Sequence, residues 1–443
     1  MELDGTIRAV SLTGRPSLVR AMGRWTLTAA VVNGVVGSGI FGLPSALVGL
    51  AGAWSPALVL AAGACIFVII LCFAEVSSRF EDAGGPYLYA REAFGATAAF
   101  HVGWLLLFTR LLSAAAALNI LTVYLASLIP PVGTPAGRVA TMTLAVLSVT
   151  LINVYGVAWG ARATNLFTLA KLIPLLILAG VGLTRFSPEV VATQTVAAPD
   201  WTTAFLLLVF AYGGFEGTTA AAGEARNPKR DSAIALVAAT AIVTAVYAVL
   251  QAVVVGLVPQ AAATATPIAT ALDVLFGPAG AVLASAGAVV SVYGWWIGFT
   301  LMMPRVVYSM AERGELPPRL AFIHPIFRTP VPAIVLVAVI AWLMAVFSTF
   351  AQAATLAAIP RLGIFMVVCA ALIALRRKAD APAAAFIVNG GPAFAVAGIV
   401  FSGWMLSTRS FDQLWLLLVV IGAGIALRAW RRPVARAVPQ QLS

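Results

Sequence analysis

Charged residues are scarce in this sequence. Only 10% of its 443 residues are Asp, Glu, Lys or Arg, whereas 61% are hydrophobic. A soluble domain carries about a quarter charged residues, because its surface must face water. The scarcity excludes a soluble globular protein, and the hydrophobic content excludes a disordered chain. The composition therefore predicts an integral membrane protein in contact with the lipid bilayer.

Cysteine and histidine are also scarce. The three cysteines, Cys65, Cys72 and Cys369, all lie inside apolar runs, and the chain has only two histidines. This pattern predicts no structural disulfide and no metal site. Motifs for nucleotide, zinc or acyl-enzyme chemistry do not occur in a catalytic context. We therefore expect neither an enzyme nor an ATP-driven pump, and no cofactor, while a channel or a non-transporting sensor remains an alternative to a carrier.

Long apolar runs are abundant. Several continue over about 18 residues or more, which excludes the alternating pattern of an outer-membrane barrel and predicts transmembrane helices. We expect an all-α polytopic membrane protein with one transmembrane domain at 25–430, between an N-terminal tail (1–24) and a C-terminal tail (431–443). The twelve predicted spans are about 25–48, 56–78, 99–129, 139–157, 163–184, 202–223, 232–257, 280–309, 331–350, 353–375, 384–407 and 412–430.

Basic residues are distributed unevenly between the predicted loops. Of the 27 Lys and Arg residues, 21 fall on the same side as the N-terminus, whereas the opposite loops hold three, Arg138, Arg185 and Arg409. Basic residues accumulate on the cytoplasmic side of membrane proteins. We therefore expect a protein of the cytoplasmic membrane with both termini in the cytoplasm, and a tail rather than a signal peptide at the N-terminus. The net charge of +11 then reflects topology and does not predict nucleic-acid binding.

Two of the predicted spans are interrupted near their middle. The first contains Gly-Ser-Gly at 37–39 followed by Pro44, and the sixth contains Tyr-Gly-Gly at 212–214 followed by Glu216. Glycine costs about 1 kcal/mol relative to alanine in a helix interior. Two such interruptions, five spans apart, are typical of inverted-repeat transporters with discontinuous helices.

Unwound backbone within a membrane is tolerated where it lines a cavity or is buried in protein. Its N–H groups, next to a helix N-terminus, can hold a carboxylate, and its carbonyls can accept hydrogen bonds from an ammonium. A zwitterion with both groups on one carbon fits this arrangement. The alternative is that the four glycines, Gly37, Gly39, Gly213 and Gly214, only allow helices to pack closely.

Further motifs accompany the two interruptions. They are Gly37-Ser38-Gly39-Ile40-Phe41-Gly42-Leu43-Pro44, Ala74-Glu75, Ala83-Gly84-Gly85-Pro86-Tyr87-Leu88-Tyr89, Phe210-Ala211-Tyr212-Gly213-Gly214-Phe215-Glu216, Glu224-Ala225-Arg226-Asn227-Pro228-Lys229-Arg230 and Met310-Ala311-Glu312-Arg313-Gly314-Glu315-Leu316-Pro317. From about residue 25 to 378, the chain resembles the amino acid–polyamine–organocation (APC) transporter superfamily in these motifs and their order. The resemblance implies a LeuT-type fold with 5+5 inverted repeats at about 25–184 and 202–375, followed by peripheral helices at about 384–430.

The resemblance also implies that the substrate is a small molecule, an amino acid or a close relative of one, bound between spans 1, 3, 6 and 8. The substrate carboxylate would meet backbone N–H groups and the hydroxyl of Ser38 and Gly39. The substrate amino group would meet carbonyls at Val35, Phe210 and Gly213.

Aromatic side chains complete the implied pocket. Phe210 would cover the substrate side chain as a gate, and Phe299 matches a second aromatic position. Trp295 lies one turn from Phe299 and faces either the substrate or the lipid and core. The predicted substrate-binding residues are Val35, Gly37, Ser38, Gly39, Ile40, Ala114, Phe210, Gly213, Gly214 and Phe299.

Lys171 is one of few ionisable residues inside a predicted span, where such residues usually face a cavity or a partner. In branches of the resembled family, a lysine of span 5 lies where sodium-coupled relatives bind a cation, so Lys171 is expected to replace sodium. Burial favours the neutral amine, which would let Lys171 carry a proton. The alternatives are an ammonium that extends to the inner interface and a structural ion pair.

Three other charges lie within spans. Glu216 occupies a position that is acidic in the family and linked to gating, or it is held in the hydrogen-bond network of the broken helix. Arg110 departs from the family; we expect it to pair with Glu216 or Glu75, with a substrate contact as the alternative. We expect Arg361 to be structural or interfacial. The predicted gating and coupling residues are Lys171, Glu216, Tyr212 and Arg110.

These features predict a secondary active transporter that takes up a neutral amino acid by alternating access, coupled to protons rather than to sodium. An obligate amino acid or amine exchanger and a carrier of polyamines or other organocations are the alternatives. The predicted outer loops contain no cysteine that could bridge to an accessory subunit. We therefore expect a monomer or a weak homo-oligomer.

Overall fold

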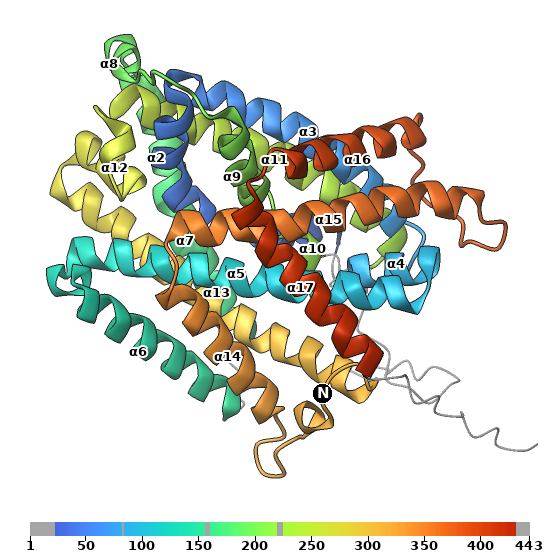
Figure 1. Ribbon diagram of the computed structural model, residues 1–443. Coiled ribbons are helices and arrows are strands. Elements are labelled where there is room, and N and C mark those ends of the chain that lie inside the picture. The colour runs from blue at the N-terminus through green and yellow to red at the C-terminus, as the bar shows by residue number, and fades with distance from the viewer. Residues whose placement is uncertain (1–22, 82–83, 156–159, 219–224, 431–443) are drawn as a thin grey trace, which may run out of the picture.

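The computed structural model describes residues 23–81, 84–155, 160–218 and 225–430. The predicted tails lie almost entirely outside these residues, as do Ala83 and Glu224 of the motifs. The α-helices (Figure 1) are α1 (Arg24–Val35), α2 (Gly39–Ala51), α3 (Ser55–Ser77), α4 (Gly85–Phe94), α5 (Ala96–Leu128), α6 (Pro135–Val154), α7 (Gly160–Gly182), α8 (Pro188–Thr193), α9 (Trp201–Ala211), α10 (Phe215–Thr218), α11 (Pro228–Leu257), α12 (Pro267–Phe276), α13 (Pro278–Glu312), α14 (Val331–Val346), α15 (Phe350–Arg377), α16 (Gly391–Ser407) and α17 (Phe411–Trp430).

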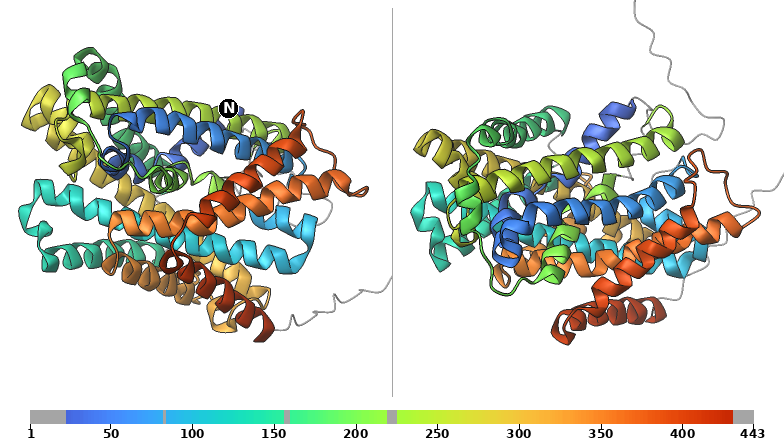
Figure 2. Two further views of the ribbon diagram at one scale, coloured as in Figure 1. Left: turned by 45° about the horizontal axis from the view of Figure 1, so that its top comes forward. Right: turned by 90° about the horizontal axis from the view of Figure 1, so that it is seen from above.

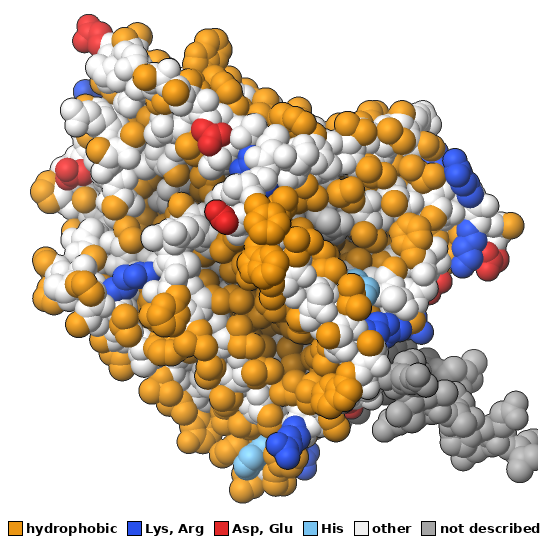
Figure 3. All heavy atoms as spheres, viewed as in Figure 1, with side chains coloured by type: hydrophobic (Ala, Val, Ile, Leu, Met, Phe, Trp, Pro, Cys, Tyr) orange, Lys and Arg blue, Asp and Glu red, His pale blue; other side chains and the backbone are white. Residues whose placement is uncertain are grey.

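The described residues form an all-α multi-pass membrane protein. They contain seven helical stretches that are long and apolar enough to cross a membrane: Gly39–Ser77, Ala96–Leu128, Pro135–Val154, Pro228–Leu257, Pro278–Glu312, Phe350–Arg377 and Phe411–Trp430. Within the described residues, helices also lie in each range predicted from the apolar runs, although 384–390 is a loop that precedes α16. On the face shown in Figure 3, hydrophobic side chains cover a large area and charged side chains are few, as expected for a protein in lipid.

Proline marks the start of many helices. It occupies the first or second position of α3, α4, α6, α11, α12, α13, α14 and α16. The missing N–H of proline is tolerated there, because the first turn of a helix has no carbonyl to bond to, and the fixed φ of proline suits the helix. The positions of the prolines in the sequence therefore set where these helices begin.

Pairs of long helices form the interior of the bundle. α15 packs along α5, and α11 packs along α3. Figures 1 and 2 show α5 and α15 running side by side across the molecule. Ala114, Ala115, Ala116 and Ala117 of α5 are almost completely buried, and such small side chains let membrane helices approach closely. α17 lies on the outside, against α5 and α15, and most of its surface stays exposed.

The backbone leaves helical geometry at both predicted interruptions. Residues 36–38 separate α1 from α2, and residues 212–214 separate α9 from α10. Gly214 has a φ of 124°, a conformation that glycine adopts without the steric cost of a side chain. The prediction of two discontinuous helices is therefore confirmed at these positions.

A buried ion cluster joins α3 and α15 at the end of the bundle that the charge distribution predicts to be cytoplasmic. The fully buried Glu75 carboxylate accepts hydrogen bonds from Arg376 Nε (2.6 Å) and Nη2 (2.5 Å). It also accepts the Val388 N–H (2.9 Å). Arg79 Nη2 lies 3.5 Å from this carboxylate, and Arg79 Nη1 donates to the Pro382 carbonyl (2.8 Å). Because Val388 and Pro382 lie in the loop before α16, the cluster holds that loop against α3.

Replacing Glu75 with alanine should lower the stability of the purified protein. The substitution removes the carboxylate that Arg376, Arg79 and the Val388 N–H bind. Breaking a fully buried ion pair costs about 3 kcal/mol or more, and the cost here is smaller because Arg376 is 25% exposed and keeps its bond to the Val388 carbonyl. We expect a lower midpoint in thermal unfolding. Asp380→Ala is the control, because this carboxylate is 79% exposed and 3.8 Å from Lys378, and such surface pairs contribute less than about 1 kcal/mol. Equal shifts in the two variants would contradict the role assigned to Glu75.

Candidate functional site

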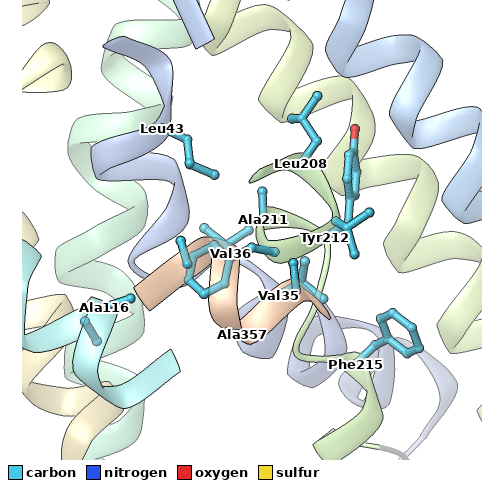
Figure 4. Packing of buried hydrophobic residues seen from close by; sticks show 14 of the residues in the cluster. Val35, Val36, Leu43, Ala116, Leu208, Ala211, Tyr212, Phe215 and Ala357 are labelled. Carbon is cyan, nitrogen blue, oxygen red and sulfur yellow. The ribbon is translucent and has the colours of Figure 1, made fainter. Parts of the chain in front are cut away.

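The two helix breaks lie against each other in the interior (Figure 4). A Cβ added to Gly39 would lie 3.4 Å from Ala211 Cα and 3.6 Å from the Phe210 ring. A Cβ added to Gly214 would lie 3.2 Å from Val35 Cα and would overlap the Gly34 carbonyl oxygen. Gly39 and Gly214 therefore accompany broken helices and also allow the two broken segments to pack closely.

Lys171 caps the break between α1 and α2. Its ammonium, carried by α7, donates to the Asn33 carbonyl (2.8 Å) and to the Val36 carbonyl (2.6 Å). The side chain is only 5% exposed. A cation at this position is favourable, because the C-terminal end of a helix carries a partial negative charge. The structure thus places Lys171 on the carbonyl end of α1 and not at an interface.

Glu216 and two arginines surround the break between α9 and α10. Glu216 Oε1 lies 2.8 Å from Arg361 Nε, and both side chains are almost completely buried. Glu216 Oε2 accepts the Gly214 N–H (2.8 Å) and lies 4.0 Å from Arg110 Nη2. Arg110 Nη2 donates in turn to the Gly214 carbonyl (2.8 Å). Of its two predicted partners, Arg110 therefore meets Glu216, since Glu75 pairs with Arg376. Arg361 is buried rather than interfacial.

Side chains already donate hydrogen bonds to two of the three carbonyls expected to bind a substrate amino group, those of Val35 and Phe210. Arg361 Nη1 donates to the Phe210 carbonyl (3.2 Å) and to Val209 (3.3 Å). Tyr247 Oη lies 3.1 Å from the Val35 carbonyl and 3.3 Å from the Ala211 carbonyl. A hydroxyl has one proton, so Tyr247 serves one of these two carbonyls at a time. The predicted contacts with an amino group remain predictions.

Aromatic side chains of α13 lie beside the first break. Trp295 and Phe299 stack with ring centroids 5.5 Å apart, and a Cβ added to Gly37 would lie 4.0 Å from Trp295 Nε1. Trp296 instead donates its Nε1–H to the Ala114 carbonyl (3.1 Å). Trp295 therefore faces the break and not the lipid, while the predicted position Ala114 is covered by Trp296.

The remaining predicted residues surround the same region. Ser38 is half-buried and Ile40 is buried at the start of α2. A Cβ added to Gly213 would overlap the Arg361 guanidinium. Tyr212 directs its hydroxyl away from α1 and donates to the Val59 carbonyl of α3 (2.9 Å). Tyr212 thus anchors the second break to α3 and does not reach the first break.

Two residues at the site were not identified from the sequence. Tyr247 of α11 bridges the breaks, and Phe350 of α15 meets the Phe210 ring edge-to-face at 6.1 Å. The sequence did contain a signal for Tyr247: its hydroxyl lies inside a long apolar run, and a buried hydroxyl needs a hydrogen-bond partner. Phe350 carries no such signal, since an aromatic residue at the start of an apolar helix is ordinary.

The electrostatics of the site favour an anionic group. The N-terminus of α2 begins at Gly39, where its partial positive charge favours an anion. Arginine stays protonated, so Arg110 and Arg361 exceed the charge of Glu216 by one positive unit. Sequence comparison agrees with this chemistry, because the profile of the amino acid permease family matches residues 22–421. The chain belongs to this family, and thus to the APC superfamily.

Its relatives are transporters rather than enzymes. The serine/threonine exchanger SteT of Bacillus subtilis is 29% identical over 85% of this chain and 88% of that protein. A methylthioribose transporter of the same organism is 29% identical over 91% of both chains. The branched-chain amino acid permease BcaP of Bacillus subtilis is 25% identical over 92% of this chain and 93% of that protein. The permease is therefore similar to these proteins over nearly its whole length.

Tyr247→Phe should destabilise the two breaks of the permease. The substitution leaves the buried carbonyls of Val35 and Ala211 without this hydroxyl, which costs about 1 kcal/mol or more. We expect a lower midpoint of thermal unfolding and weaker substrate binding. Tyr308→Phe is the matched control, because the Tyr308 hydroxyl is exposed and, among the described residues, bonds only to Glu312. A Tyr247→Phe protein as stable as the Tyr308→Phe protein would contradict the bridging role.

Proposed function

We propose that this permease is a secondary active transporter that moves amino acids across the cytoplasmic membrane by alternating access. Two broken helices that face each other support this proposal most directly, because they present backbone donors and acceptors inside the bundle. The proposed architecture has twelve spans with two inverted repeats of five, at about 25–184 and 202–375, and both termini in the cytoplasm. One half of the bundle would rock against the other around the breaks.

We propose a neutral amino acid as the substrate. Its carboxylate would bind at Ser38 and Gly39, where α2 begins, and its side chain would lie against the rings of Phe210 and Phe299. The excess positive charge beside the second break disfavours a polyamine or another cation. The names of the relatives agree in part: one is an exchanger of serine and threonine and one is a branched-chain amino acid permease, but another is a methylthioribose transporter.

A thermal-shift screen tests the substrate class. A ligand that binds only the folded state raises the apparent stability in proportion to its occupancy. L-serine, L-threonine, L-leucine, methylthioribose and spermidine would be compared at equal concentration. We expect stabilisation by at least one of the amino acids and none by spermidine. Stabilisation by spermidine alone would overturn the assignment.

A proton gradient, coupled to transport through Lys171, is the proposed driving force for amino acid uptake. The ammonium occupies a place between the Asn33 and Val36 carbonyls, where carbonyl oxygens could otherwise hold a hard cation such as sodium. An amine that gains and loses its proton during the cycle would bind these carbonyls more strongly when charged, because charge-assisted hydrogen bonds are the stronger ones. Proton transfer would thus loosen and restore the contact of α7 with the first break.

Lys171→Ala should abolish proton-driven accumulation. Labelled amino acid would be added outside proteoliposomes that carry an imposed pH gradient. The variant should accumulate no label above the concentration reached by equilibration. Lys229→Ala is the control, because Lys229 forms a half-exposed pair with Glu81 at 3.5 Å. Undiminished accumulation by the Lys171→Ala protein would contradict the coupling role.

Obligate exchange is the second candidate function, and the relative described as an exchanger favours it. Uptake into proteoliposomes with and without internal amino acid separates the two modes. A proton-coupled importer fills empty vesicles when a pH gradient is applied. An exchanger takes up labelled substrate only when unlabelled substrate is inside. A channel would show no stimulation by internal substrate.

A further inference from the structure

A cavity of about 420 Å³ lies at the end of the bundle predicted to be extracellular. Its walls come from α2, from the last turns of α5, from the start of α6, from the segment after residue 260 and from the start of α15. Its volume is in the range of small-molecule sites. Among the described residues that line it, none is acidic. The cavity can therefore accommodate an amino acid outside the two breaks.

Arg138 provides the positive charge of this cavity. Its Nη2 donates to Asn119 Oδ1 (2.7 Å), to the Ala345 carbonyl (3.1 Å) and to the Ser348 carbonyl (2.6 Å). All three acceptors are neutral, and the described residues place no carboxylate within ion-pair distance of Arg138. The guanidinium is thus held rigidly by one nitrogen, while Nε and Nη1 have no acceptor in the described part of the chain. A half-buried arginine in this state attracts an anion.

Ser45 adds a second polar group to the wall of the cavity. Its side chain is 6% exposed, and its hydroxyl has no hydrogen-bond partner in the described residues. A buried hydroxyl without a partner costs free energy. The oxygen itself is buried, so a solute in the cavity reaches it only when the wall beside Ser45 opens. Ser45 is therefore a further donor for a ligand that Arg138 already holds.

Phe350 separates the cavity from the site at the breaks. Its ring lines the cavity and packs on Gly42, where an added Cβ would come within 2.6 Å of Phe350 Cε1. The same ring meets Phe210 edge-to-face at 6.1 Å. A solute that moves from the cavity to the breaks must therefore displace Phe350, Phe210 or both.

We propose that this cavity is an outer binding site for the carboxylate of an amino acid, with Arg138 as the anion contact and Ser45 as a further donor. Amino acids would bind there before they pass Phe350. The route rests on the proposed transport function, whereas carboxylate binding in the cavity does not. The proposal thus predicts that Arg138 selects for negatively charged groups that enter the cavity, although it lies far along the chain from either break.

A labelling experiment on the full chain tests the proposal. Ala265 is exposed and lines the cavity, so Ala265→Cys provides a reporter thiol. Membrane-impermeant thiosulfonates are applied to the protein in proteoliposomes, one carrying a sulfonate and one a trimethylammonium group, with the parent chain as the background. Replacing Arg138 with glutamine should slow the anionic reagent about tenfold relative to the cationic one. Arg138→Lys, which keeps the charge, should retain the preference.

Competing solutes identify the group that binds. L-leucine and 4-methylpentanoate carry a carboxylate and should slow labelling of the Ala265→Cys protein, whereas 3-methylbutylamine should not. Equal protection by the amine, or a rate ratio unchanged by Arg138→Gln, would overturn the proposal. Loss of the preference in Arg138→Lys, with an unchanged thermal midpoint, would also overturn it.

The same protein distinguishes failure of this site from failure of the transport function. Exchange of labelled L-leucine, L-serine or L-threonine is measured in parallel in the Ala265→Cys proteoliposomes. Charge-selective labelling without any transport would refute the proposed function and leave the outer site standing. Transport without charge-selective labelling would refute the outer site alone.

Discussion

Backbone groups that leave a helix inside a membrane need partners, because the hydrocarbon core contains no water to bind them. This requirement explains much of the interior of the permease. Lys171 serves two carbonyls at the end of α1, Tyr247 lies between the Val35 and Ala211 carbonyls, and Arg361 serves the carbonyls that end α9. Each side chain comes from a helix outside the break that it serves. The broken segments are therefore stable only within the assembled bundle.

The few charges of the chain are used where the backbone is irregular. Glu216, Arg361 and Arg110 form one connected group around residues 212–214. Burying such charges costs free energy unless they are paired, so the group is held by its mutual contacts. Because two arginines face one carboxylate, the group keeps a positive charge beside the site. The same arrangement that satisfies the broken helix thus favours a substrate that carries a carboxylate.

The two ends of the bundle are held by different contacts. At the predicted cytoplasmic end, the Glu75 carboxylate binds Arg376 and the Val388 N–H, so polar contacts join α3, α15 and the loop before α16. At the other end, the rings of Phe350 and Phe210 separate a cavity from the breaks. Aromatic packing can be displaced without leaving a charge unpaired, whereas the ion cluster cannot. Movement is therefore easier to accommodate at the aromatic end.

Local chemistry in the sequence determined that the chain is a membrane protein, where its helices and the two breaks lie, and which charged residues lie inside the spans. Apolar length, glycine and proline act within a few neighbouring residues, so their effects can be read without the fold. Only the tertiary structure decided which partners meet. Arg361 reaches the break about 150 residues earlier in the chain, Tyr247 lies between the two breaks, and Arg138 lies without a counter-ion in a cavity of the described chain. Such contacts depend on how helices pack against one another, and residue spacing along one helix carries no information about that packing.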